Sequence, residues 1–201
     1  MSYLDIAKHY EECFEKHGDN HLGVDWPNHE DTLKRYQIML DITTPESSLL
    51  DFGCGTSALY QYAIDTKQNN FNYSGLDITS AFVEKSKEKF PNQTFYHKDI
   101  LVDNDIPNFD YIVCNGTFTE KRDLSYDEMF EFFSNTIKIL WNKTNKGIAF
   151  NLMSKHVDWE RDDLFHVSLD KLGWFLKDNL SRNFTIRNDY KLYEYTTYVY
   201  K

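Results

Sequence analysis

The chain has 201 residues, which is enough for one α/β domain with a full core but short for two domains. Charged residues make up 27% and aromatic residues 16% of it, a composition typical of a folded protein and not of a disordered one. The net charge is −10 and there is no basic run, which disfavours a nucleic-acid partner because phosphate neutralisation supplies much of that affinity. We therefore expect a small-molecule substrate.

The chain also lacks the features of a membrane or secreted protein. No apolar run approaches a membrane span, and the segment MSYLDIAKHYEE has no signal-peptide core. The cysteines Cys13, Cys54 and Cys114 are odd in number and lack metal-type spacing, so reduced thiols are expected. We predict a cytoplasmic protein with no membrane partner, as a monomer or a homodimer.

The first 45 residues are predicted to form a helical cap. Tyr3, Ala7, Tyr10 and Phe14 recur at the spacing of one helix face, so residues 3–17 are expected to be helical. A polar stretch with glycines and a proline, residues 16–31, predicts a loop. A second helix is expected over about 28–40. The single domain 1–201 would then consist of this cap, 1–45, and a core, 46–201.

From residue 48 strands and helices alternate, which predicts a parallel sheet with right-handed crossovers. The last two strands are close enough in sequence to form an antiparallel hairpin at one edge. The expected strands are 48–52, 72–77, 93–97, 111–114, 147–153, 184–187 and 193–200, and the expected helices are 57–66, 80–89, one beginning at the capping-box residue Ser125, and 168–179.

The stretch LLDFGCGTSALY, residues 49–60, is the focus of the core. An apolar run ends at Asp51, breaks at Gly53 and Gly55 and resumes with helical character, which indicates a strand, a tight turn and a helix start. Small residues there allow close approach of a ligand to the backbone. A dinucleotide-binding turn would have the pattern GxGxxG, but here Gly53 and Gly55 are followed by Ser57 and Ala58, so pyrophosphate binding is disfavoured. The acidic Asp51 suits a cationic ligand.

The segment DFGCGTSAL resembles the cofactor loop of class I S-adenosylmethionine-dependent methyltransferases, an acidic residue, x, Gly, x, Gly, x, Gly, with Ser57 as a departure. The resemblance extends to the ends of the next three strands, across about residues 49–116. It implies an α/β, Rossmann-like fold: a seven-stranded, mostly parallel sheet with helices on both faces, an antiparallel C-terminal hairpin and the N-terminal helical cap.

The resemblance also implies cofactor contacts for S-adenosyl-L-methionine, with S-adenosyl-L-homocysteine as product. Asp77, 22 residues after Gly55, would accept the ribose hydroxyls, and Asp99 the adenine amino group, while Ile100 covers the ring. Each Asp alone is equally consistent with a helix cap or turn residue. The implied contacts are Asp51, Phe52, Gly53, Cys54, Gly55, Asp77, Ile78, Asp99, Ile100, Asn115 and Gly116. Arg35 would pair with the methionine carboxylate, with Lys16 as a rival and a surface charge as the alternative.

Methyl transfer from a sulfonium is an in-line displacement, so the protein needs chiefly to align donor and acceptor. The segment VCNGTFTEK lacks the Asn/Asp-Pro-Pro-aromatic signature of amino-group methylation in DNA or protein glutamine. It also lacks an Asp that could begin a catechol-type metal site. His156, Asp158 and His166 are dispersed over a loop, so polar contacts are expected of them and no metal is predicted.

The acceptor is expected between the cap and the loops after the fourth and fifth strands. Basic and aromatic groups there suggest a polar acceptor with a flat portion, and they leave a neutral and an anionic acceptor open. His156 is the candidate general base, since its ordinary pKa lies nearest neutrality, although a solvated loop histidine explains it equally well. The predicted acceptor-binding residues are His17, Asp25, Trp26, Phe118, Lys121, Lys155, His156 and Trp159.

A narrower resemblance concerns HGDNHLGVDWPNHEDTLKRYQIML and FNLMSKHVDWE, which look similar to bacterial methyltransferases encoded with capsule and surface-polysaccharide genes, including the O-methyl phosphoramidate type. It implies a nucleotide-linked or phosphorus-bearing acceptor steadied by Lys121, Arg122 or Lys155. Two alternatives stay open: an inactive cofactor-binding regulatory subunit, and an NAD-dependent oxidoreductase, which the missing third glycine disfavours.

Overall fold

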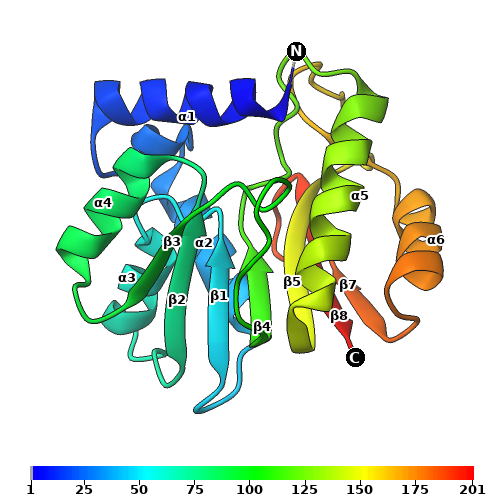
Figure 1. Ribbon diagram of the computed structural model, residues 1–201. Coiled ribbons are helices and arrows are strands. Elements are labelled where there is room, and N and C mark those ends of the chain that lie inside the picture. Colours follow the sequence, from blue (N-terminus) through cyan, green and yellow to red (C-terminus); the bar gives the residue numbers. More distant parts are fainter. Residues whose placement is uncertain (1) are drawn as a thin grey trace.

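A mostly parallel sheet forms the centre of the molecule (Figure 1). The computed structural model describes residues 2–201. The strand order is β3-β2-β1-β4-β5-β8-β7, with the short β6 paired to β5. The strands are β1 Ser48–Phe52, β2 Asn72–Asp77, β3 Thr94–His97, β4 Phe109–Cys114, β5 Thr144–Ser154, β6 His166–Val167, β7 Phe184–Arg187 and β8 Glu194–Tyr200. The predicted fold class is confirmed, and β6 is the one strand that the sequence did not indicate.

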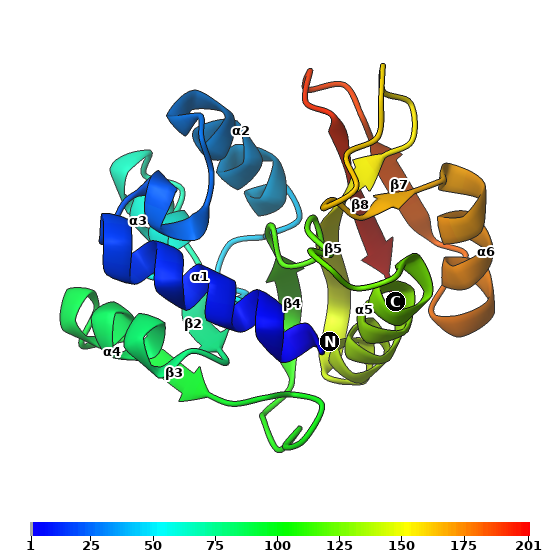
Figure 2. The ribbon, with the colours of Figure 1, turned by 90° about the horizontal axis from the view of Figure 1, so that it is seen from above.

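Helices cover both faces of this sheet (Figure 2). In the view from above, α2, α3 and α4 lie on one face and α5 and α6 on the other, while α1 crosses the carboxyl ends of the central strands. The helices are α1 Tyr3–His17, the 3-10 helix η1 His21–Val24, α2 His29–Leu40, α3 Ala58–Asp65, α4 Ser80–Lys89, α5 Tyr126–Asn142 and α6 Leu169–Asn179. Within residues 2–201 no helix is both long and apolar enough to cross a membrane.

Two buried cores result from the alternation of side chains along the strands. Leu50 of β1 and Ile112 of β4 pack with α5 and α6, whereas their neighbours Leu49 and Val113 pack with α2 and α3. Because both faces are covered, neighbouring residues on both faces of these strands are apolar, as Leu49 and Leu50 and Ile112 and Val113 are, which is the pattern of a buried parallel sheet.

Local sequence signals explain where the helices begin. The predicted capping box at the start of α5 is present: Ser125 Oγ accepts from the Glu128 amide, and the Glu128 carboxylate accepts from the Ser125 amide. A second capping box, Ser2 with Asp5, begins α1. The capping box stabilises the first turn of α1. This turn is part of the helix that lies over the carboxyl ends of the strands.

The C-terminal edge of the sheet is antiparallel, as expected. β8 pairs with β5 from Gly147↔Tyr200 to Met153↔Glu194, and β7 pairs with β8 outside it. This arrangement brings Glu194, at the start of β8, next to the carboxyl end of β5 and so to the functional edge of the sheet.

Candidate active site

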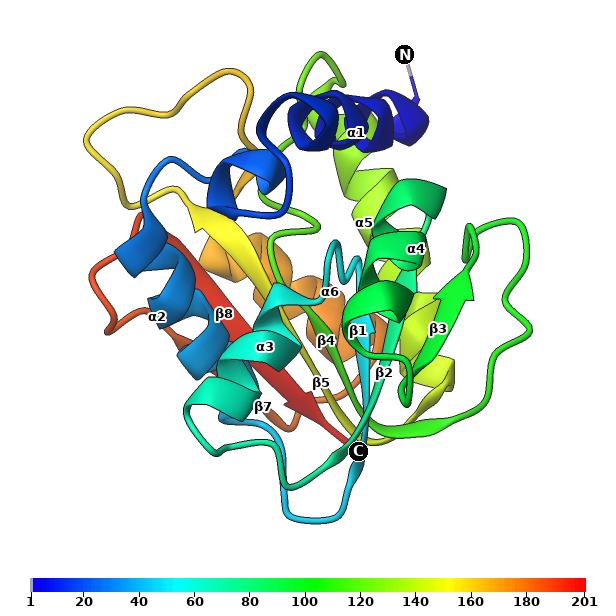
Figure 3. The same ribbon diagram turned by 90° about the vertical axis from the view of Figure 1, so that its left-hand side faces the viewer.

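A cavity of about 390 Å³ opens at the carboxyl ends of β1, β2 and β4 and the loop after β3. Figure 3 shows α1 above these ends. In open α/β sheets, ligands bind at this edge. All the residues predicted to contact the cofactor, Arg35 excepted, line the cavity: Asp51, Phe52, Gly53, Cys54, Gly55, Asp77, Ile78, Asp99, Ile100, Asn115 and Gly116.

The glycine turn after β1 needs its glycines. Gly53 and Gly55 have φ of +72° and +53°, a region that side chains with a Cβ rarely adopt. The Gly53 amide donates to the Leu76 carbonyl at 2.8 Å, which ties the turn to β2. A Cβ on Gly53 would lie 2.6 Å from Thr117 Oγ1. The turn is therefore tightly confined between β2 and the loop after β4.

Ser57 replaces the third glycine of the motif without changing the turn. It adopts the left-handed conformation itself, with φ +60° and ψ +37°, as the residue before α3. Its hydroxyl donates to Ser86 Oγ at 2.8 Å, and Ser86 Oγ donates to the Gly55 carbonyl at 3.0 Å. These buried hydrogen bonds join α4 to the turn, so the serine supports the same backbone path that a glycine would take.

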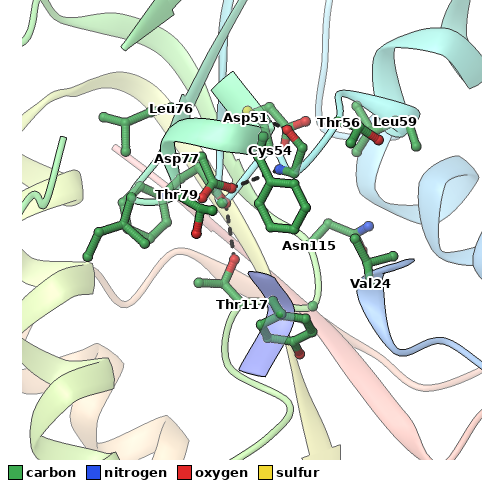
Figure 4. A pocket seen from close by; sticks show the side chains of 18 of the residues that line it. Val24, Asp51, Cys54, Thr56, Leu59, Leu76, Asp77, Thr79, Asn115 and Thr117 are labelled. Atoms are coloured by element: carbon green, nitrogen blue, oxygen red, sulfur yellow. Dashed lines mark hydrogen bonds between the residues drawn. The ribbon is translucent and has the colours of Figure 1, made fainter. Parts of the chain in front are cut away.

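Asp77 at the end of β2 is held by backbone amides. Its two carboxylate oxygens accept from the Gly55 amide at 2.8 Å and the Thr79 amide at 2.9 Å. Burial raises the pKa of Asp77, and these amides oppose the rise. Figure 4 shows its side chain close to the glycine turn, with Asp51 and Thr117 around the same space.

Asp51 at the end of β1 is buried next to this turn. The Tyr73 hydroxyl donates to its Oδ2 at 2.9 Å. Burial raises the pKa of Asp51 to about 7; the hydrogen bond from Tyr73 lowers it, and the charge of Asp77 raises it. A cation in the cavity would relieve this unfavourable burial of negative charge.

Asp99 in the loop after β3 joins the sheet to α1. Its Oδ2 accepts from the Tyr3 hydroxyl at 2.6 Å, and its Oδ1 accepts from the Leu101 amide at 3.0 Å. The Tyr3 ring stacks on Phe132 of α5, with centroids 4.9 Å apart. The first turn of α1 is thus attached on both sides of the cavity, and it covers the opening.

Arg35 does not reach the cavity, contrary to its predicted place. Its Nε donates to Glu194 at 2.9 Å, and its guanidinium lies 4.8 Å from the Trp26 ring centroid. Asn151 also donates to Glu194, at 2.9 Å, and accepts from the Gly116 amide at 2.8 Å. The arginine therefore supports the loop after β4 through a buried network instead of meeting a cofactor carboxylate.

Of the predicted acceptor-binding residues, only Trp26 lines the cavity, where it packs on Gly116. Phe118 is buried in the core against Phe52. Trp159 is 73% exposed. His156 is bound through its backbone amide to Ser154 Oγ.

The polar residues of that prediction lie outside the cavity as well. Lys121 Nζ donates to the carbonyls of Arg122 and Leu124, and Lys155 pairs with Glu160. Asp25 pairs with His9. His17 ends α1. The loop cations of the acceptor prediction are thus already bound to protein oxygens.

Several cavity residues were not predicted from the sequence. Tyr3 and Tyr10 of α1, and Thr117 after β4, line it. The face with Tyr3, Ala7 and Tyr10 was visible as a helical pattern, but the pattern did not link it to the site. Burial raises the pKa of Tyr10 well above its ordinary value, so its hydroxyl stays protonated and can donate a hydrogen bond. His166, set aside as a polar residue, accepts from the Arg161 amide in a buried loop contact.

Comparison with known proteins agrees with this geometry. Residues 50–140 match the family described as "Methyltransferase domain". A Mycobacterium tuberculosis protein named as a methyltransferase, Rv1506c, is 27% identical over 157 residues, covering 77% of this chain and 93% of that one.

Two solved structures share the fold. Magnesium protoporphyrin IX methyltransferase from Synechocystis, crystallised with S-adenosylhomocysteine, has a TM-score of 0.67 at 14% identity, covering 98% of this chain and 99% of that chain. Burkholderia thailandensis 1,6-didemethyltoxoflavin-N1-methyltransferase has a TM-score of 0.65 at 10% identity, covering 99% and 86%. The glycine turn and the strand-end residues Asp51, Asp77 and Asp99 all lie within the part of the chain that matches the methyltransferase-domain family.

Proposed function

We propose that S-adenosylmethionine occupies the cavity with its adenosine part near Asp77, Asp99 and Ile100 and its methionine part over the turn at Gly53. The convergence of these strand-end groups on one cavity carries this proposal. Asp77 keeps lone pairs free to accept ribose hydroxyls while its amide contacts hold it in place. The buried carboxylate of Asp51 favours a cationic sulfonium over a neutral cofactor.

We further propose that the acceptor is a small polar molecule held at the end of the cavity formed by Tyr10, Trp26 and Thr117. These residues combine an apolar ring with hydroxyl groups that can orient a polar acceptor. The position is adjacent to Gly116, where the Cβ of any larger residue would lie 2.5 Å from the Trp26 ring. The pocket is therefore narrow at the point where we place the transferred methyl group.

Of the neutral and the anionic acceptor that the sequence left open, the contacts of the loop cations favour the neutral one. Lys155 is paired with Glu160, and Lys121 with backbone carbonyls. Arg122 lies 3.5 Å from Glu120. A nucleotide-linked or phosphoramidate acceptor, and with it a role in capsule synthesis, would require these cations to leave their partners. Such an acceptor is the second candidate, and it is included in the test below.

Alignment and exclusion of water are the chain's main contributions to the reaction. The cofactor supplies the activated methyl group, and transfer requires the acceptor atom in line with it. α1, attached through Tyr3, closes the cavity from above and keeps out competing water. His156 does not line the cavity, so we do not assign it the role of base; an acceptor that keeps no proton on its reacting atom needs none.

Isothermal titration with S-adenosylmethionine, S-adenosylhomocysteine and NAD tests the cofactor proposal. Binding of the first two but not of NAD is expected. Binding of NAD alone would instead indicate an oxidoreductase.

Methyl transfer from radiolabelled S-adenosylmethionine to two acceptor panels, neutral hydroxylated or amine compounds and phosphorylated nucleotides, tests the acceptor. Turnover confined to the phosphorylated panel would overturn the neutral acceptor. Tight cofactor binding without turnover on any panel or on a cell metabolite extract would favour a regulatory subunit.

A further inference from the structure

A group of potential metal ligands lies beside the cavity, where α1 faces the end of η1. His9 and Cys13 are four residues apart on α1, so their side chains leave the same face of the helix. Asp25 follows η1, and its Oδ2 lies 2.8 Å from His9 Nε2, while Cys13 Sγ lies 3.6 Å from that nitrogen. One ligand atom from each residue lies within 4.8 Å of the other two.

These separations are close to those of a tetrahedral zinc site. Zn–N bonds of about 2.0 to 2.1 Å and Zn–S bonds of about 2.3 Å place neighbouring ligand atoms roughly 3.3 to 3.6 Å apart. The Cys13 to His9 distance already fits this range. The distance from His9 Nε2 to Asp25 Oδ2 must increase by about 0.5 Å. The Asp25 side chain can move by this amount because it is 43% exposed.

Glu120 lies next to this group. Its side chain is 11% exposed, and its Oε2 has no hydrogen-bond partner among the described residues. It shares the guanidinium of Arg122 with Asp25. A largely buried carboxylate oxygen without a donor is unfavourable, and a cation bound beside it would lessen this cost.

One cation of the protein is already nearby and must be taken into account. Arg122 Nη1 lies 3.5 Å from Glu120 Oε2 and 3.9 Å from Asp25 Oδ2. Both separations lie beyond the ordinary length of a charged N–H···O bond, so the guanidinium screens the two carboxylates without saturating them. An ion bound between His9, Cys13 and Asp25 would still leave Arg122 beside Glu120.

We propose that His9, Cys13 and Asp25 bind a divalent metal ion of the zinc type. A thiolate and an imidazole together select zinc and related borderline-soft ions over magnesium or calcium. The ion joins α1 to the end of η1, two segments beside the cavity. It therefore holds α1 over the cofactor and supplements the Tyr3 to Asp99 contact at the other end of the helix.

The sequence-based prediction of no metal considered the strand 4 motif and His156, Asp158 and His166. It did not consider His9 with Cys13, although their spacing is a recognised signal for metal ligands on a helix. Asp25, which lies beyond the end of α1, could be added to that pair only after folding.

Titration of the full-length, tag-free, EDTA-treated protein with Co²⁺ tests the proposal directly. We expect one ion per chain and a thiolate-to-cobalt charge-transfer band in the near ultraviolet, displaced by Zn²⁺. Cys13→Ser should lose the band, and Asp25→Asn should weaken binding more than about 100-fold, since even outer partners of metal ligands contribute about 10- to 100-fold. Glu12→Gln, an exposed change on the same helix, is the matched control and should bind like wild type.

Thermal unfolding separates loss of the site from loss of the fold. Zn²⁺ should raise the Tm of wild type and Glu12→Gln and leave that of Cys13→Ser unchanged. A wild-type protein with no charge-transfer band, or a Cys13→Ser variant that binds Co²⁺ as tightly as wild type, would overturn the proposal. None of these measurements depends on methyl transfer.

Discussion

The two sides of the cavity are built by different means. On the side of β1, β2 and β3, carboxylates are fixed by backbone amides and tyrosine hydroxyls, as when Asp77 accepts from the Gly55 and Thr79 amides. On the side of β4, β5 and the N-terminal residues, charged side chains distant in sequence neutralise one another, as Arg35 does with Glu194. The first side lines the cavity with carboxylates, and the side chains of the second support the loop after β4. Charge at a functional edge is therefore not by itself a sign of ligand contact.

The largest expected effect tests the supporting role of Arg35. The Glu194 side chain is 1% exposed, so Arg35→Gln leaves a buried carboxylate without its cation. We expect a loss of about 3 to 5 kcal/mol in the free energy of unfolding, the range for breaking a buried pair. Urea unfolding measures it. Glu194→Gln with Arg35→Gln should recover part of the loss. If Arg35→Gln is as stable as wild type but fails to bind S-adenosylmethionine, Arg35 belongs to the cofactor side after all.

A somewhat smaller effect concerns the pH dependence that Asp51 contributes. Its folded pKa, about 7, lies above its unfolded value, so the folded state holds an extra proton between about pH 4 and 7. The free energy of unfolding therefore falls as pH rises through this window and levels off above it. Asp51→Asn removes this titration. Between pH 4 and 8 the free energy of unfolding of the variant should therefore rise relative to that of wild type by up to about 4 kcal/mol. Denaturant unfolding at several pH values should show this; a difference independent of pH would contradict the buried, protonated state.

The smallest expected effect is on stability, when alanine replaces either of two glycines. Gly53→Ala places a Cβ at φ +72° and against Thr117, and it should cost about 1 to 3 kcal/mol. Gly173, inside α6, has open space around its Cα, so Gly173→Ala should stabilise the protein by about 0.5 to 1 kcal/mol. Thermal unfolding of both variants gives the comparison. Equal shifts of the same sign would show that the turn at Gly53 is not confined as described.

The strand-end residues named from the sequence all line one cavity because the information that locates them is local. An acidic residue, two glycines and the strand-end aspartates each follow directly from a strand, and parallel strands bring their carboxyl ends to one edge. Ser57 could be judged only as a small residue; its left-handed backbone and its bond to Ser86 on α4 were visible only in the folded chain.

The other side of the cavity could not be predicted in the same way. Arg35 and Glu194 are 159 residues apart, and their pairing depends on the antiparallel docking of β8 against β5. Phe118 follows Gly116 closely, yet it turns into the core because the loop after β4 packs on α5. A list of polar and aromatic residues in loops does not distinguish side chains that face a ligand from those that bind one another.

The central claim is that Asp77 and its neighbours hold the adenosyl part of S-adenosylmethionine. Titration calorimetry of wild type, Asp77→Ala and Asp178→Ala tests it most directly, since Asp178 is an exposed carboxylate on α6, paired with a neighbouring lysine. Wild type and Asp178→Ala should bind equally, and Asp77→Ala should bind at least about 100-fold more weakly, a difference of about 2.7 kcal/mol, while retaining a cooperative unfolding transition. Undiminished affinity in a folded Asp77→Ala protein would contradict the account.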